Sequence, residues 1–138
     1  MIEALIGVAV GVLTIVLARI IRGQHWVYSL GLLVLPGLYA SFALRVGEQA
    51  VGVKEMIYGA PFVVAGLVFV FVSVRQSAVV VGAFWILHGL YDLVHSQLIT
   101  NAGVPRWYPV FCFSVDFVVG AYLLWLSRRI ANANLHQA

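Results

Sequence analysis

Residues 77–98 read SAVVVGAFWILHGLYDLVHSQL, an apolar stretch long enough for a helix to cross a lipid bilayer. Three ionisable side chains stand inside it, His88, Asp92 and His95. The next apolar stretch contains two further polar groups, Cys112 and Asp116. Ionisable residues in the middle of apolar helices indicate a membrane protein with a polar site inside the bilayer.

The composition supports this class. Apolar residues make up 63% of the 138-residue chain and charged residues only 9%, which is far from the usual balance of a soluble domain. Five apolar stretches each approach the roughly 20 residues that a spanning helix needs. They cover residues 2–21, 26–44, 56–74, 77–98 and 107–127. The sequence therefore predicts an all-α, polytopic membrane protein, with five transmembrane helices in one compact bundle and a single domain over residues 1–138.

The connections between these stretches are short. They cover residues 23–25, 47–55, 75–76 and 99–106. Helices joined so tightly are expected to be antiparallel neighbours. Among the Asp, Glu, Lys and Arg residues, all except Asp92 and Asp116 fall at or near the ends of the predicted helices, where a spanning chain keeps its charges.

Basic residues predict the orientation of the bundle. One side of a five-span chain holds Arg19, Arg22, Arg75, Arg128 and Arg129, and the other holds Arg45, Lys54 and Arg106. Because basic residues favour the cytoplasmic side, the N-terminus is predicted outside and the C-terminus inside. The net charge of +3 is the ordinary result of such flanks and gives no reason to expect nucleic-acid binding.

The polar residues in the last two stretches fall on two helix faces. At about 100° per residue, Asp92 lies about 40° from His88 and His95 about 20° the other way, so these three share a face. Cys112 and Asp116 are four residues apart and share a face of the next helix. His88 and Asp116 each lie about ten residues, or about 15 Å, from the shared connection. We therefore predict that they meet near the bilayer middle, in a polar site that opens outward near His95.

The cost of burying charge requires partners for the two aspartates. An ionised Asp at the centre of a spanning helix costs about 2.5–3.5 kcal/mol on insertion scales. The simplest partners are His88 for Asp116, and His95 or Tyr91 for Asp92. Hydrogen bonds of this kind can serve only to join helices.

A metal site is the first functional hypothesis. Imidazole, carboxylate and thiol groups together suit a divalent ion such as Zn, Fe or Mn. The candidate ligands are His88, Asp92, His95, Cys112 and Asp116. They fall into two sets, His88 with both aspartates, or Asp92 with His95 and Cys112, because His88 and His95 are two helical turns apart. Three ligands and an open position would let the ion activate water against a lipid or small apolar substrate. The sequence does not decide whether the protein is an enzyme.

Two other functions use the same residues. A series of His95, Asp92, His88 and Asp116 offers groups that exchange protons, with Glu55, Tyr58 and Arg45 at its outer mouth. Transport of protons or small solutes through so few helices would need a homo-oligomer, and the GxxxG pair Gly7 and Gly11 offers one contact face. Haem is less favoured, because His88 and His95 share one helix face and an axial pair would need a second helix or subunit.

The residues of the last two stretches also resemble a family. The run WILHGLYDLVH at 85–95, the run PRWY at 105–108, and Cys112 and Asp116 are similar to small bacterial integral membrane proteins that form a domain of unknown function. The similarity is limited to residues 85–116. It implies a multi-pass protein of the bacterial inner membrane and emphasises the same five polar residues, but it implies no reaction or substrate.

Overall fold

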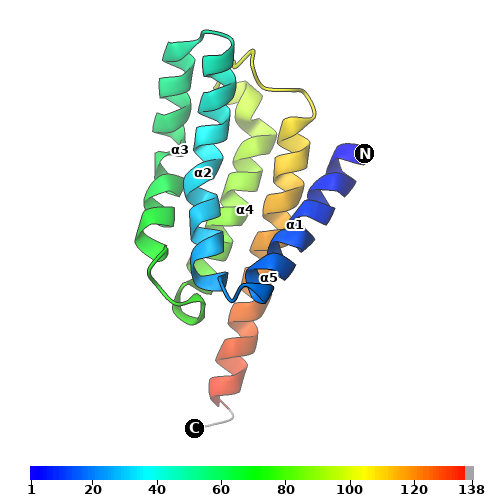
Figure 1. Cartoon of the computed structure of the whole chain (residues 1–138), viewed down its shortest axis with the longest axis vertical. Coiled ribbons are helices and arrows are strands. Elements are labelled where there is room, and N and C mark those ends of the chain that lie inside the picture. Colours follow the sequence, from blue (N-terminus) through cyan, green and yellow to red (C-terminus); the bar gives the residue numbers. More distant parts are fainter. Residues whose placement is uncertain (136–138) are drawn as a thin grey trace.

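The computed structural model describes residues 1–135 and consists of α-helices (Figure 1). The helices are α1 (Ile2–Ile20), α2 (Gln24–Arg45), α3 (Gln49–Phe69), α4 (Val74–Leu98) and α5 (Tyr108–Leu135). All five are long and apolar enough to cross a membrane, which confirms the predicted helical class. Residues 136–138, the end of the predicted domain, lie outside the described residues.

Three predicted boundaries are wrong. α3 begins at Gln49 rather than at residue 56, so most of the predicted 47–55 connection is helical. It ends at Phe69, and the connection to α4 covers residues 70–73 instead of the predicted 75–76. α5 continues to Leu135, past the predicted end at residue 127. A helix satisfies its own backbone groups on both sides of the hydrocarbon boundary, so its ends need not coincide with the ends of the apolar run.

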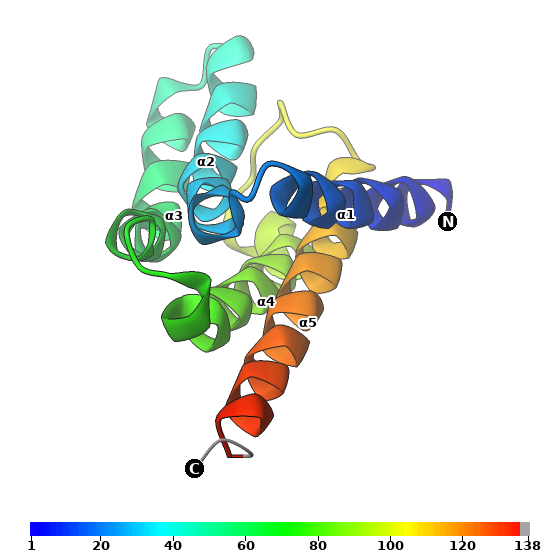
Figure 2. The same ribbon diagram turned by 60° about the horizontal axis from the view of Figure 1, so that its bottom comes forward.

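The helices are arranged as two hairpins and one added helix. α2 packs along α3, and α4 packs along α5, as short connections predict. α1 lies mainly against α5 and makes few contacts with α2, so the prediction that all consecutive helices are neighbours is wrong for α1 (Figure 2). It holds only weakly for α3 and α4, which make few contacts with each other. α4 also touches both helices of the first hairpin, which places the α4 face with His88, Asp92 and His95 at the centre of the bundle.

The GxxxG pair of α1 explains the position of that helix. A Cβ on Gly7 would collide with the backbone carbonyl of Phe111 in α5, and a Cβ on Gly11 would lie 2.9 Å from Cβ of Val118. Only glycine allows the two backbones to come this close. The Gly7 and Gly11 face is therefore occupied by α5 of the same chain and is not available as the homo-oligomer contact considered from the sequence.

A similar close approach joins α4 to α5 at the level of the polar residues. A Cβ on Gly89 would lie 3.2 Å from Cβ of Asp116 and 3.4 Å from the carbonyl oxygen of Phe113. Because Gly89 directly follows His88, the absence of a side chain there brings the His88 ring within reach of α5. Gly89 therefore helps to place the His88 side chain against α5.

Candidate functional site

His88 of α4 and Asp116 of α5 form the central contact of the site. Nδ1 of His88 lies 2.7 Å from Oδ2 of Asp116, which is a short hydrogen bond between two buried side chains. The equal distance of both residues from the α4–α5 connection predicts this pair, and the geometry confirms it. The ring of His88 also packs edge-on against Phe62 of α3, with centroids 4.7 Å apart, so the imidazole is fixed from two sides.

Asp92 lies one turn further along α4, and its partners differ from the predicted ones. The hydroxyl of Tyr39 in α2 donates a hydrogen bond to Asp92 Oδ1 over 2.8 Å. Asp92 Oδ2 lies 3.5 Å from Nδ1 of His88, within ion-pair range but too far for a good hydrogen bond. The predicted partners, His95 and Tyr91, are wrong because both side chains turn towards Glu55 instead.

Cys112 completes a group of four donors that we call the inner cluster: His88, Asp92, Cys112 and Asp116. One ligand atom from each residue lies within 4.8 Å of the others, and all four residues are buried. The thiol of Cys112 lies 3.8 Å from the hydroxyl of Tyr108, one turn earlier in α5. The inner cluster combines the first predicted ligand set with Cys112, and it could hold one metal ion.

The inner cluster has two oxygens without partners. Asp92 Oδ2 and Asp116 Oδ1 are buried and accept no hydrogen bond from any residue that the structure describes. Buried carboxylate oxygens are normally hydrogen-bonded, and leaving one unsatisfied costs about 1–3 kcal/mol or more. Both oxygens belong to the same four-residue group, so a single bound cation or proton donor could satisfy them together.

His95, the fifth candidate ligand, lies in a separate group. Its Nε2 lies 2.9 Å and 3.0 Å from the two carboxylate oxygens of Glu55 in α3. Asn101 donates to Glu55 Oε1 over 2.8 Å, and Tyr91 donates more weakly to Oε2 over 3.4 Å. We call Glu55, Tyr91, His95 and Asn101 the outer cluster. The second predicted ligand set, Asp92 with His95 and Cys112, is not brought together.

Glu55 is the main functional residue that sequence reasoning misplaces. The sequence predicts a connection over 47–55 with Glu55 at the mouth of a pathway, but Glu55 is only 1% exposed. The spacing of Glu55 from other buried residues of α3 could have indicated its burial. Buried positions recur every three or four residues, as in a helix, at Gly52, Glu55, Gly59 and Phe62. Tyr58, the other α3 residue predicted at the mouth, is exposed.

Tyr39 connects the two clusters, and its sequence context gives no signal for this role. Its hydroxyl binds Asp92 of the inner cluster, and its ring stacks on His95 of the outer cluster with centroids 4.1 Å apart. The amide of Asn101 also donates to the Tyr39 backbone carbonyl over 3.1 Å. An isolated tyrosine in an apolar helix is ordinary, so only the fold shows that Tyr39 lies between the clusters.

The charge of the site is unusual for a buried region. Glu55, Asp92 and Asp116 are three carboxyl groups inside the bundle, each at most 1% exposed. Their ion-pair partners within residues 1–135 are His88 and His95, with no Lys or Arg side chain among them. The two histidines can balance at most two negative charges, so the inner cluster favours an added positive charge.

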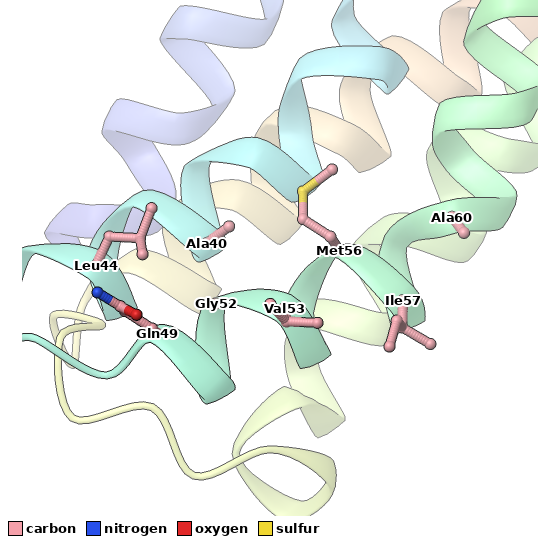
Figure 3. Close-up of a pocket in the computed structure, with 8 residues that line it drawn as sticks. All are labelled: Ala40, Leu44, Gln49, Gly52, Val53, Met56, Ile57 and Ala60. Carbon is pink, nitrogen blue, oxygen red and sulfur yellow. The ribbon is translucent and has the colours of Figure 1, made fainter.

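Access to the inner cluster differs from the predicted outward-opening site. A pocket of about 340 Å³ at the end of α4 is lined by His95, by Asn101 and by other residues of the α4–α5 connection, which covers residues 99–107, but by no member of the inner cluster. A separate apolar groove of about 560 Å³ runs between α2 and α3 (Figure 3). Its lining, which includes Leu44, Val53 and Ile57, contains none of the candidate ligands. All four residues of the inner cluster are at most 3% exposed, so the cluster is closed by the surrounding side chains.

Comparison with other proteins adds no relative to this description. No protein-family model, curated protein or solved structure matches the chain.

Proposed function

We propose that this multi-pass membrane protein holds one divalent metal ion in the inner cluster, between α4 and α5. The observation that carries the proposal is the pair of buried oxygens, Asp92 Oδ2 and Asp116 Oδ1, which have no hydrogen-bond partner within residues 1–135 and lie beside an imidazole and a thiol. In a membrane interior such atoms are costly unless a ligand satisfies them.

Charge balance supports a divalent ion. Two aspartates and the thiolate that Cys112 forms when it binds a metal carry three negative charges, and a neutral His88 adds none, so a divalent ion balances two of the three and a monovalent ion only one. Uncompensated charge is costly in a medium that stabilises charge poorly. The mixture of nitrogen, oxygen and sulfur donors suits Zn, Fe or Mn rather than Mg or Ca, which prefer oxygen ligands alone.

The dimensions of the cluster are compatible with such an ion after a small contraction. Tetrahedral ligand atoms at Zn distances of about 2.0–2.3 Å lie about 3.4 Å apart, whereas the four donors here lie within 4.8 Å of one another. Contraction of the widest spacing by about 1.4 Å lies within the reach of side-chain torsions. Four protein donors in a closed site resemble structural metal sites more than catalytic ones, so retention of an ion is better supported than turnover of a lipid or small apolar substrate.

Proton or small-solute movement is the second candidate function. It is favoured by the continuity of polar side chains from Asn101 through Glu55 and His95 to Tyr39 and Asp92. The contact between His95 and Tyr39 is a ring stack rather than a hydrogen bond, so the series is interrupted there. A third interpretation, that both clusters only join helices, requires a proton on Asp92 or Asp116 to pair the two partnerless oxygens.

The membrane setting belongs to the same proposal. We place the C-terminus in the cytoplasm and the N-terminus outside, because five of the eight basic residues lie at the end of the bundle where α5 terminates. The resemblance of residues 85–116 to small bacterial membrane proteins supports a location in the bacterial inner membrane.

Elemental analysis by mass spectrometry tests the proposal. The full chain is purified in detergent without chelator, together with Asp116→Asn and Glu55→Gln, two variants that each change one buried carboxyl group to an amide. We expect stoichiometric metal in the wild type and in Glu55→Gln, and loss of metal in Asp116→Asn. A metal-free wild type would contradict the proposal, as would equal metal in all three proteins. For the second function, Asp92→Asn should abolish pH-dependent flux in proteoliposomes.

A further inference from the structure

A second polar cavity lies at the opposite end of the bundle from the outer cluster. It has a volume of about 410 Å³ and is formed by the end of α1, the start of α2 and the connection between α3 and α4, segments that gather at one end of the molecule (Figure 1). Its lining residues are Arg19, Arg22, Gln24, Phe71, Ser73 and Val74. The cavity contains no member of either cluster and is independent of the proposed metal site.

The two arginines of the cavity are exposed, and no carboxylate among residues 1–135 lies within ion-pair distance of either. The same end of the bundle also contains Arg75, Arg128 and Arg129. The five acidic residues of the sequence lie towards the other end or inside the bundle, at Glu3, Glu48, Glu55, Asp92 and Asp116. The cavity is therefore an uncompensated cationic site.

Arg22 occupies a backbone conformation that usually belongs to glycine. Its φ of 54° lies in the left-handed region, and it is the single non-glycine residue with positive φ in residues 1–135. The next amide, Gly23 N–H, donates to the Ala18 carbonyl over 2.9 Å and closes the end of α1. Glycine is preferred at this position because it avoids the strain of the side chain. The strain in Arg22 is consistent with a use for its guanidinium.

Other groups of the cavity suit an anion with an attached apolar chain. α4 begins at Val74, so the amides of its first turn lie at the rim and add partial positive charge. Gln24 accepts a hydrogen bond from the Tyr122 hydroxyl through Oε1, which leaves its amide group as a donor. Phe71, beside these groups, is 92% exposed and suits contact with hydrocarbon at a membrane surface.

We propose that this cavity binds the phosphate headgroup of an anionic membrane lipid, with Arg19 and Arg22 as the main ligands and Phe71 against the acyl chain. A phosphate group matches the planar donor array of arginine. Basic pockets between the ends of spanning helices are well placed to take such headgroups from the membrane surface. A lipid also accounts for the exposed Phe71, which a free phosphate ion would not use.

Native mass spectrometry of the full chain in detergent tests this inference, with phosphatidylglycerol and phosphatidylcholine as probes. Each arginine that contacts the headgroup directly is expected to contribute about 1 kcal/mol, or about five-fold in affinity. We therefore expect Arg19→Gln/Arg22→Gln to weaken phosphatidylglycerol binding about 30-fold. The matched control Arg128→Gln/Arg129→Gln removes the same charge from the same end but outside the cavity, and should change binding less than about three-fold. An equal loss in both double variants, or no loss in the first, would overturn the proposal.

Two further measurements distinguish a bound lipid from a structural role of Arg22 and from a soluble anion. Arg22→Gly relieves the backbone strain, so it should keep or raise the melting temperature while weakening phosphatidylglycerol binding, whereas a purely structural role of Arg22 would leave lipid binding intact. Inorganic phosphate in large excess should leave the bound phosphatidylglycerol in place. Suppose instead that inorganic phosphate displaces the lipid from the wild type and that Arg19→Gln/Arg22→Gln no longer binds inorganic phosphate. That result would assign the cavity to a soluble anion and overturn the lipid proposal.

Discussion

The inner and outer clusters contain the same pair of chemical groups, but they differ in how many of the carboxylate oxygens have hydrogen-bond partners. Each holds a buried imidazole within 3.0 Å of a buried carboxylate, His88 with Asp116 and His95 with Glu55. In the outer cluster both oxygens of Glu55 have hydrogen-bond partners. In the inner cluster Asp92 and Asp116 each keep one oxygen without a partner in the part of the chain that the structure describes.

The difference indicates different roles. A buried polar group whose hydrogen bonds are complete stabilises one arrangement of the helices. Glu55 does so by joining α3 to α4 and to the 99–107 connection. A buried polar group with incomplete bonding favours whatever ligand completes it. We therefore interpret the outer cluster as a structural link and the inner cluster as the binding site.

Removal of the carboxylate from the outer cluster should have the largest effect on stability. Glu55→Ala leaves His95, Asn101 and Tyr91 without their common acceptor, and we expect the free energy of unfolding to fall by about 3 kcal/mol. Reversible denaturation in mixed detergent measures the change. Glu55→Gln keeps one acceptor oxygen and should cost about 1 kcal/mol. A Glu55→Ala protein as stable as the wild type would contradict a structural role for the outer cluster.

The inner-cluster change that matches Glu55→Gln should have a smaller effect once metal is removed. Asp92→Asn replaces a charged group with a neutral one and keeps an acceptor for Tyr39, so in the presence of chelator the free energy of unfolding should change by less than about 1 kcal/mol. The same denaturation assay measures this variant. A loss of about 1 kcal/mol or more, like that expected for Glu55→Gln, would show that the two clusters have the same role.

The bond between Tyr39 and Asp92 should contribute least. Tyr39→Phe removes the hydroxyl but keeps the ring that stacks on His95, and hydrogen bonds between membrane helices average about 0.6 kcal/mol. We expect a loss of this size by denaturation, together with a weaker hold on metal because Asp92 is no longer oriented. Unchanged metal affinity would indicate that Tyr39 does not position the inner cluster.

The same contrast explains how much of the site can be predicted from the sequence. His88 and Asp116 lie at equal distances from one short connection, so their contact follows from helical rise alone. Glu55 and Tyr39 come from the other hairpin, whose position relative to α4 depends on side-chain packing that no local pattern specifies. The neighbour of α1 is not predictable either, because Gly7 and Gly11 mark a close helix contact without identifying α5 as the partner.

The boundaries of the helices are predicted with mixed success for a related reason. Hydropathy locates the part of a helix that lies in hydrocarbon, and it places α1, α2 and α4 to within a few residues. It fails where a helix extends past its apolar run, as in the first turns of α3 and the last turns of α5. Glu55 lies in such an extension, which is why the sequence predicts this buried acid at a surface.

The melting temperature in detergent, measured with and without chelator, tests the assignment of the two clusters most directly. A ligand that binds only the folded protein stabilises it by about 2.7 kcal/mol at a hundred times its dissociation constant. We predict that chelator lowers the melting temperature of the wild type and of Glu55→Gln by several degrees, and leaves that of Asp116→Asn unchanged. An equal response of all three proteins, or no response of the wild type, would contradict a metal site in the inner cluster.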